Sequence, residues 1–302
     1  MEAIGFYIFY GLNWIITLLP LRVLYFFSDI LFLILYYFPS YRKKVVMENL
    51  RNSFPEKSNE ELSVIARKFY RHFADLFVEI LKLTHLSRKE LQKRFTINNP
   101  DLVNKLCSAG HDVIVVHSHY NNWEWVGVSF PFFARYECIS VYKPLQNKQF
   151  DNFLNGLRTK TNSGLAQMNH VLKKIIENRS MDIRALYGFI SDQTPAKPDI
   201  RYYTKFLNQD TPVFLGIEKI AAKYDMSVVF LNVQKIKRGY YNMTIELLFE
   251  QTKGLPDYLV TETHVKRLEE LIRDKPEFWL WTHRRWKYKK EAFNDKNCDS
   301  NS

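Results

Sequence analysis

The chain begins with a nearly uncharged apolar segment. Residues 3–21 contain no charged side chain, and after Arg22 a second apolar run continues to Phe38 with Asp29 as its only charge. At a rise of about 1.5 Å per residue, a helix over residues 3–21 approaches the roughly 30 Å of a bilayer core. The pattern predicts a helix that spans the membrane or inserts deeply into it. A buried hairpin of a soluble protein is the alternative interpretation.

The residues around this segment indicate that it stays in the mature protein and that it has a defined orientation in the membrane. No basic residue precedes the apolar run, no small-residue cleavage site follows it, and the apolar pattern resumes after Arg22, so a cleaved signal peptide fits poorly. Arg42, Lys43 and Lys44 then form a basic cluster, which predicts that the rest of the chain lies on the cytoplasmic side. We expect three parts, which are a membrane anchor at 1–41, a folded domain at 42–290 and a flexible tail at 291–302.

Helical and strand patterns alternate after the basic cluster. Ser58 and Glu61 have the spacing of a capping box, and an apolar repeat at helical spacing follows for about 25 residues. Residues 112–116 form a short β-branched run, which is typical of a strand buried on both faces. The order predicts an α/β fold with a mixed, largely parallel sheet flanked by helices. Further strands are predicted at 138–142, 185–190, 227–233 and 241–249, and helices at 148–160 and 211–224.

Composition narrows the class of function. The 302 residues include 43 Lys and Arg against 32 Asp and Glu, which gives a net charge of +11, and 16% of residues are aromatic. These values fit a protein that binds nucleic acid or an anionic membrane surface. The basic residues are scattered and no nucleic-acid motif is recognised, so the apolar N-terminal segment favours the membrane and no nucleic-acid partner is expected. Three cysteines without CxxC spacing predict neither a disulfide framework nor a common zinc module.

The candidate chemistry lies in the loop after the 112–116 strand. Ligands of such sheets collect at the carboxyl ends of strands, and here the strand leads into His117, His119 and Glu124. A carboxylate folded back onto the imidazole would fix the tautomer of His119 and stabilise the imidazolium that forms when it accepts a proton. His119 is therefore predicted to be a general base and Glu124 its orienting partner. Asn121 tolerates the left-handed backbone that such a turn needs.

The candidate residues of this loop, and the Asp192–Gln193 segment that follows the predicted 185–190 strand, also have simpler interpretations. His117 and His119 could form a metal pair, but no third ligand at a useful spacing is evident, so we predict no metal. Glu124 could face solvent in a first helical turn, where the helix dipole favours a carboxylate. Asp192 and Gln193 could belong to a plain turn.

The loop and several later segments resemble a known family. HYNNWEW at residues 119–125 is similar to the HYGNWEW signature of the bacterial lipid A late acyltransferases, a branch of the lysophospholipid acyltransferase superfamily with a His-x4-Asp/Glu motif. The resemblance extends from the N-terminus to Lys289 and implies a glycerolipid acyltransferase-like domain at 42–290. The other similar segments follow in the family's order, at residues 48–58, 141–158, 191–195, 211–221 and 276–287.

The resemblance implies a reaction and a set of site residues. A fatty acyl group would move from an acyl carrier protein thioester to a hydroxyl of a lipid A precursor at the cytoplasmic face of the inner membrane, without a cofactor or a covalent acyl-enzyme. The basic surface suits an acidic acyl carrier protein, an anionic membrane and a glycolipid substrate. Arg158 is expected to stabilise the oxyanion of the thioester carbonyl. The other expected substrate-binding residues are Asn122, Asp192, Gln193, Arg284 and Arg285.

Several other functions remain open at this point. The same chemistry could acylate another membrane lipid, such as a lysophospholipid, an aminolipid or a pigment precursor. A thioesterase would use water as the acceptor at the same His119 site. A non-enzymatic membrane adaptor would explain the apolar segment and the basic face, but it gives no reason for His119 and Glu124 at a strand end. Arg158 could also be a surface ion-pair partner.

Overall fold

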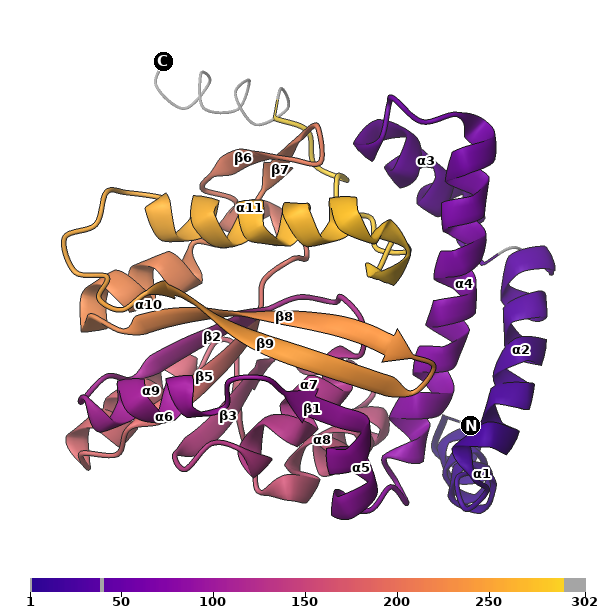
Figure 1. Cartoon of the computed structure of the whole chain (residues 1–302), viewed down its shortest axis with the longest axis horizontal. Coiled ribbons are helices and arrows are strands. Elements are labelled where there is room, and N and C mark those ends of the chain that lie inside the picture. Colours follow the sequence, from indigo (N-terminus) through magenta and orange to yellow (C-terminus); the bar gives the residue numbers. More distant parts are fainter. Residues whose placement is uncertain (1, 39–40, 291–302) are drawn as a thin grey trace.

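A seven-stranded sheet forms the centre of the protein (Figure 1). The computed structural model describes residues 2–38 and 41–290, so the tail predicted at 291–302 lies outside the described residues. All neighbouring strands of the sheet are parallel except the last two in the sequence, which form a long antiparallel hairpin over residues 227–249. The predicted mixed, largely parallel sheet is confirmed. Its strands in spatial order are β1 (Phe95–Ile97), β9 (Tyr240–Phe249), β8 (Ser227–Lys237), β2 (Val113–His117), β5 (Ala185–Ile190), β3 (Glu137–Tyr142) and β4 (Gly164–Gln167).

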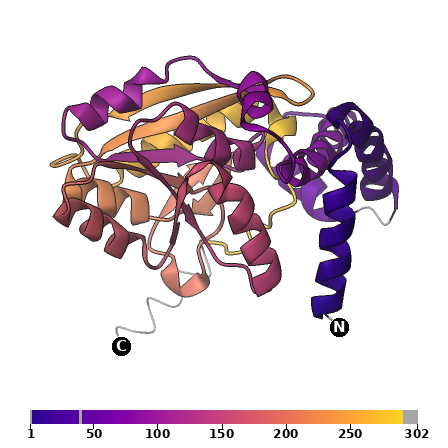
Figure 2. The same ribbon diagram turned by 90° about the horizontal axis from the view of Figure 1, so that it is seen from below.

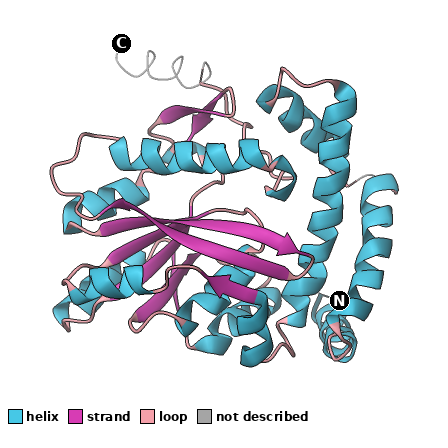
Figure 3. Ribbon diagram, viewed as in Figure 1, coloured by secondary structure: helices cyan, strands magenta, loops and turns pink. Residues whose placement is uncertain are grey.

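Helices cover both faces of this sheet (Figure 3). The residues of β2 alternate between two hydrophobic cores: Ile114 and Val116 belong to one, and Val113 and Val115 to the other. The strand is therefore buried on both faces, as its β-branched run predicted. The first core includes α9 (Val171–Ser180), α10 (Gly216–Tyr224) and α11 (Leu259–Asp274), and the second includes α5 (Arg88–Arg94), α6 (Asp101–Ser108), α7 (Trp123–Ser129) and α8 (Lys148–Arg158).

A layer of four N-terminal helices stands beside the sheet (Figure 1). They are α1 (Glu2–Ile16), α2 (Leu21–Tyr37), α3 (Lys43–Ser53) and α4 (Asn59–Lys82). The predicted capping box is confirmed at the start of α4, where the Glu61 N–H donates to Ser58 Oγ and the Ser58 N–H donates to the Glu61 carboxylate. These two bonds satisfy N–H groups that have no partner within the helix, and α4 then continues for 24 residues.

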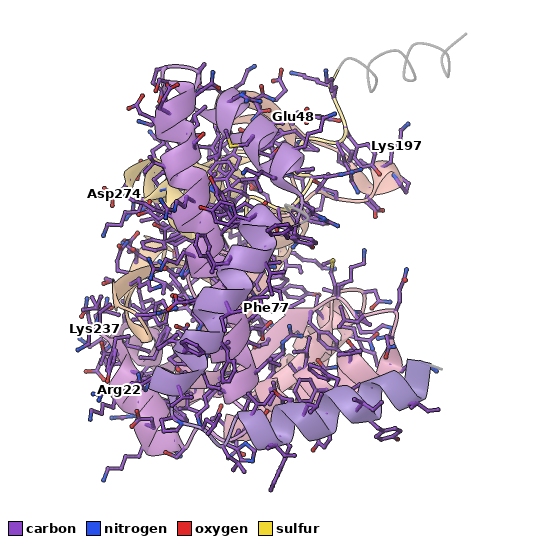
Figure 4. The ribbon with its side chains drawn as sticks, turned by 90° about the vertical axis from the view of Figure 1, so that its right-hand side faces the viewer. Arg22, Glu48, Phe77, Lys197, Lys237 and Asp274 are labelled. Atoms are coloured by element: carbon purple, nitrogen blue, oxygen red, sulfur yellow. The ribbon has the colours of Figure 1, made fainter. Side chains whose placement is uncertain are left out.

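The apolar start of the chain forms two short helices in place of one long helix. The chain turns between α1 and α2, where Pro20 precedes the first residue of α2 and lacks the N–H that a continuous helix would need. The long helix predicted for residues 3–21 is therefore not formed. Within 2–38 and 41–290, no helix is both long and apolar enough to cross a membrane. Figure 4 shows α1 lying crosswise to α2, with Arg22 near the start of α2.

The α1 helix packs against the sheet domain through aromatic side chains. Phe6 and Phe9 contact Phe150 of α8 at ring-centroid distances of 5.2 and 5.1 Å, and Phe9 also contacts Phe153 at 5.7 Å. Figure 2 shows α1 extending along the outside of the molecule, with the N-terminus at its free end. The N-terminal helices are thus attached to the domain that carries the candidate site.

One predicted helix is shorter than expected. The segment 211–224 was predicted to be helical throughout, but a separate hairpin of β6 (Tyr203–Phe206) and β7 (Gln209–Pro212) includes its first residues. The helix α10 begins only at Gly216. Pro212 pairs with Tyr203 at the open end of this hairpin, and the local sequence pattern did not indicate that pairing.

Candidate active site

The loop 118–122 connects β2 to α7 and is held against the C-terminal segment. Asn121 has a φ of 55°, which confirms the left-handed turn expected there. Its backbone N–H donates to the Phe278 carbonyl at 2.9 Å, and the Leu280 N–H donates to the His119 carbonyl at 3.2 Å. The Asn121 Nδ2 donates to the Val233 carbonyl of β8 at 2.7 Å. The backbone of this candidate catalytic loop is therefore fixed from two sides.

The partner of the His119 ring is Asp192. In the parallel pair β2–β5, His117 lies opposite Ile190, so His119 and Asp192, each two positions past the end of its strand, lie next to each other. His119 Nδ1 lies 2.7 Å from Asp192 Oδ1, and the His119 N–H donates to Asp192 Oδ2 at 3.0 Å. The predicted pairing of His119 with Glu124 is wrong, because α7 carries the Glu124 carboxylate away from the imidazole to a different partner. Asp192, expected to bind substrate, orients His119 instead.

The ionisation of Asp192 fixes the tautomer of His119. Burial alone would raise the pKa of Asp192, but the charge and hydrogen bonds of His119 and the hydrogen bond from Trp279 Nε1 lower it to about 2. An ionised carboxylate only accepts hydrogen bonds, so Nδ1 of His119 carries a proton, and in the neutral form of the ring Nε2 has the free lone pair. Gln193 Nε2 donates to this lone pair at 3.2 Å. The His119 Nε2 atom is thus arranged as a base, and a substrate hydroxyl could replace the Gln193 amide.

Glu124 forms a second charged pair with Arg158. The guanidinium binds the carboxylate with two hydrogen bonds, from Nη2 to Oε1 at 2.6 Å and from Nε to Oε2 at 2.9 Å. Burial alone would lower the pKa of Arg158, but the hydrogen bonds and charge of Glu124 raise it. Arg158 lies at the end of α8 and Glu124 in the first turn of α7. The pair therefore joins two helices on the same side of the sheet.

Both charged pairs border one cleft. The cleft has a volume of about 820 Å³, and its lining includes His119, Glu124, Arg158 and Gln193. The half-buried His117 also lines it, and desolvation lowers the pKa of that imidazole to about 4, so His117 is neutral at physiological pH. In the part of the chain that the structure describes, no group of three or more His, Cys, Asp or Glu side chains is arranged to bind a metal.

The sequence agrees with one known family over nearly its whole length. The profile of the family described as bacterial lipid A biosynthesis acyltransferase matches residues 1–288. The chain belongs to this family. No individual curated protein matches the sequence.

Two residues expected to bind substrate are buried in this acyltransferase. Asn122 is fully buried; its Oδ1 accepts the Trp125 N–H at 3.0 Å and caps α7, and its Nδ2 donates to Glu79 at 2.7 Å. Arg285 is 2% exposed, and its Nη1 donates to the Pro212 carbonyl at 2.7 Å. Burial lowers the pKa of Arg285 to about 10. Neither side chain has room for a ligand, so these two expectations are corrected.

Arg284 has the opposite environment from its neighbour Arg285. It is exposed and lines a basic cleft of about 720 Å³ between α3 and the C-terminal segment. The Thr194 hydroxyl, which borders the active-site cleft, donates to the Arg285 carbonyl at 2.6 Å, so one loop contact separates the two clefts. The charged residues of the basic cleft are Lys44, Arg284, Lys287, Lys289 and Lys290, with Glu48 and Asp210.

Proposed function

We propose that this member of the lipid A acyltransferase family transfers a fatty acyl group from an acyl carrier protein thioester to a hydroxyl of a lipid A precursor, with His119 as the general base. The observation that carries the proposal is the His119–Asp192 pair, which engages Nδ1 of the ring and leaves Nε2 facing the cleft. A base with this geometry accelerates proton transfer by about 10²- to 10⁴-fold.

The proposed reaction needs no covalent enzyme intermediate. His119 Nε2 takes the proton of the acceptor hydroxyl, and the oxygen attacks the thioester carbonyl carbon to form a tetrahedral oxyanion. The carbon–sulfur bond then breaks, the ester forms, and the thiolate leaving group takes the proton from the His119 imidazolium. Asp192 stabilises that imidazolium and holds the ring in place.

Arg158 is proposed to stabilise the oxyanion, with Glu124 as its positioning partner. Glu124 uses Nε and Nη2 of the guanidinium, and Nη1 makes only a 3.5 Å contact with Asn155. An arginine held at two of its nitrogens loses less conformational entropy when it binds a developing negative charge. Glu124 therefore supports the chemistry without touching His119.

The basic cleft supports an acidic carrier protein as the donor. Its five cations outnumber its two carboxylates, and it lies one loop contact from the active-site cleft. Charge of this kind speeds the encounter with an acidic partner and weakens with salt. We propose that Arg284 contributes to this surface.

The exposed apolar surface of α1 and α2 supports association with the inner membrane. An exposed apolar area of this extent is unusual for a protein in water, and helices with such a surface can lie in the membrane interface. We propose that these helices rest in the cytoplasmic leaflet and bring the cleft to its glycolipid substrate. The exposed side chains include Ile4, Tyr7, Ile8, Leu12, Trp14, Ile15, Val23, Phe26, Phe27, Ile30, Leu33 and Ile34.

The proposal is tested by acyl transfer in membranes from cells that express the wild type, His119→Ala or His111→Ala. His111 lies just before the opposite end of β2 and serves as the matched histidine control. The membranes receive labelled acyl carrier protein thioesters and a tetraacylated lipid A precursor, and the lipids are analysed by mass spectrometry. We expect one added acyl group with the wild type and His111→Ala, and none with His119→Ala. Label on another lipid would reject the lipid A acceptor, and label only in free fatty acid would indicate a thioesterase.

A further inference from the structure

A fully buried carboxylate connects the N-terminal helices to the catalytic loop. Glu79 of α4 is 0% exposed and accepts three hydrogen bonds from three different elements. Tyr25 of α2 donates to Oε1 at 2.8 Å, while Asn122 of the loop and Tyr241 of β9 each donate to Oε2 at 2.7 Å. The catalytic loop and α2 thus meet at one side chain that lies outside the cleft.

This carboxylate acts on the loop through the start of α7. Asn122 uses its amide N–H to bind Glu79 and its amide oxygen to cap α7 at the Trp125 N–H. The Trp125 indole also donates to the Glu79 carbonyl at 3.0 Å. Glu124 lies between Asn122 and Trp125, so the orientation of the helix start determines where the Glu124 carboxylate and its arginine lie.

The α2 helix has two different faces at this point. Tyr25 and Ser28 are buried and donate to carboxylates of α4, whereas Phe26, Phe27 and Ile30 are exposed. Tyr25 also needs space at the turn between β8 and β9, because a side chain on Gly239 would overlap its hydroxyl. The Tyr25–Glu79 contact therefore forms only when α2 is docked in this position against both α4 and the turn.

We propose that Glu79 is a positioning residue of the catalytic loop, and that Tyr25 makes the geometry of α7 depend on the docking of α2. The inference rests on the proposed function, because it concerns turnover at the same cleft. Anything that binds the exposed face of α2 and shifts the helix would then change turnover without entering the cleft.

The test compares Tyr25→Phe with Ser28→Ala. Both variants delete one hydroxyl donated from α2 to a buried carboxylate of α4, at 2.8 Å for Tyr25 and at 2.7 Å for Ser28 with Asp75. Of these two residues, Tyr25 alone shares its carboxylate with Asn122. Any general loosening of the α2–α4 contact appears in both variants, so the difference between them reports the proposed coupling.

Two measurements are made on the full-length protein. The first is kcat and KM for a labelled acyl carrier protein thioester, and the second is hydrogen exchange of the α7 backbone amides. Loss of one hydrogen bond to the buried Glu79 carboxyl group predicts a fall of about three- to tenfold in kcat for Tyr25→Phe, with faster exchange in α7. KM should stay within about twofold, because the change affects positioning more than ground-state binding. Ser28→Ala should match the wild type in both measurements.

Equal kcat and equal α7 exchange in Tyr25→Phe and Ser28→Ala would overturn the proposed coupling. Glu79→Gln keeps the volume but replaces one acceptor oxygen with a donor, and a folded Glu79→Gln protein should lose more kcat than Tyr25→Phe. If Glu79→Gln does not fold, the comparison of Tyr25→Phe with Ser28→Ala still tests the proposed coupling. If the wild type itself neither transfers nor hydrolyses any thioester, the proposed function fails, and the exchange measurement alone then supports or rejects the coupling.

Discussion

Two charged pairs border the cleft, and each takes one member from the segment 119–125. His119 pairs with Asp192 and Glu124 pairs with Arg158, so the two ends of the motif serve different partners. The Asp192 side chain is 2% exposed and accepts three hydrogen bonds, whereas Glu124 is 11% exposed and is held by one arginine. The His119–Asp192 pair holds the imidazole ring in one orientation, and the Glu124–Arg158 pair holds the guanidinium in one position.

The change with the largest expected effect breaks the first pair. Asp192→Asn keeps the shape, but the asparagine amide can donate to Nδ1 of His119 and place the ring proton on Nε2, the atom that we propose as the base. We expect kcat to fall by about 10²- to 10⁴-fold. A steady-state assay of acyl transfer from a labelled thioester measures this kcat.

The matched control for this change is Asp112→Asn. Asp112 is also a buried carboxylate, but it lies at the opposite end of β2 and binds Arg179 at 2.7 Å. The control should lose stability and keep the kcat of its folded fraction. If Asp192→Asn retained wild-type kcat, Asp192 would not orient the base.

Breaking the second pair should have a smaller effect. Glu124→Gln and Arg158→Ala should each lower kcat by about 10- to 100-fold, because the guanidinium is displaced or removed from the developing oxyanion. The double variant should be no slower than Arg158→Ala alone, since Glu124 is proposed to act only through Arg158. Independent losses that multiply in the double variant would show that Glu124 has a role of its own.

A similar ion pair outside the cleft provides the control for these single and double variants. Arg267 binds Glu246 with two hydrogen bonds, from Nε at 2.6 Å and from Nη2 at 2.9 Å, and joins α11 to β9. Arg267→Ala removes a bidentate ion pair of the same kind. It should change stability while kcat stays at the wild-type value.

The first pair also predicts a pH dependence of stability. The pKa of Asp192 falls from 3.8 in the unfolded chain to about 2 in the folded protein, so the contribution to stability is complete above about pH 5 and is lost as the pH falls through 3.8 toward 2. The difference corresponds to about 2 kcal/mol of unfolding free energy. Urea unfolding at pH 5 and pH 3 should show a smaller pH effect in Asp192→Asn than in the wild type. Equal pH effects in the two proteins would contradict this contribution.

Features that depend on neighbouring residues were predictable from the sequence. The capping box at Ser58, the buried strand β2 and the left-handed turn at Asn121 each follow from a few adjacent side chains, and the structure confirms all three. The position of His119 at a strand end follows from the same local pattern. The resemblance to the acyltransferases, now confirmed over residues 1–288, adds the reaction class.

Pairings between distant segments were not predictable in the same way. Asp192 was expected at the correct edge of the sheet, but its contact with His119 depends on β5 lying next to β2, although β3 and β4 come between them in sequence. The usable signal was that both residues lie two positions past the end of their strands. Glu124 was assigned to His119 by sequence proximity, which the helical turn of α7 overrides.

Adjacent residues with different environments were a second source of error. Arg284 and Arg285 look equivalent in sequence, but the turn of the backbone after Trp281 exposes the first and buries the second against the Pro212 carbonyl. The apolar start has a similar explanation. Its composition predicts a long helix, and the single residue Pro20 marks where the helix divides.

The smallest expected effect concerns the turn that separates the two pairs. Asn121 combines a φ of 55° with a hydrogen bond to the Val233 carbonyl. Asn121→Gly loses only the hydrogen bond and should cost about 1 kcal/mol of unfolding free energy, whereas Asn121→Ala adds left-handed strain of about 1 kcal/mol. Because the loop backbone stays bonded to Phe278 and Leu280, Asn121→Gly should keep kcat within about threefold of the wild type. Urea unfolding measures the stability order of the two variants, and transfer assays measure their kcat. A kcat loss well beyond threefold that is equal in Asn121→Gly and Asn121→Ala would mean that the side chain, and not the turn, holds the two pairs in place.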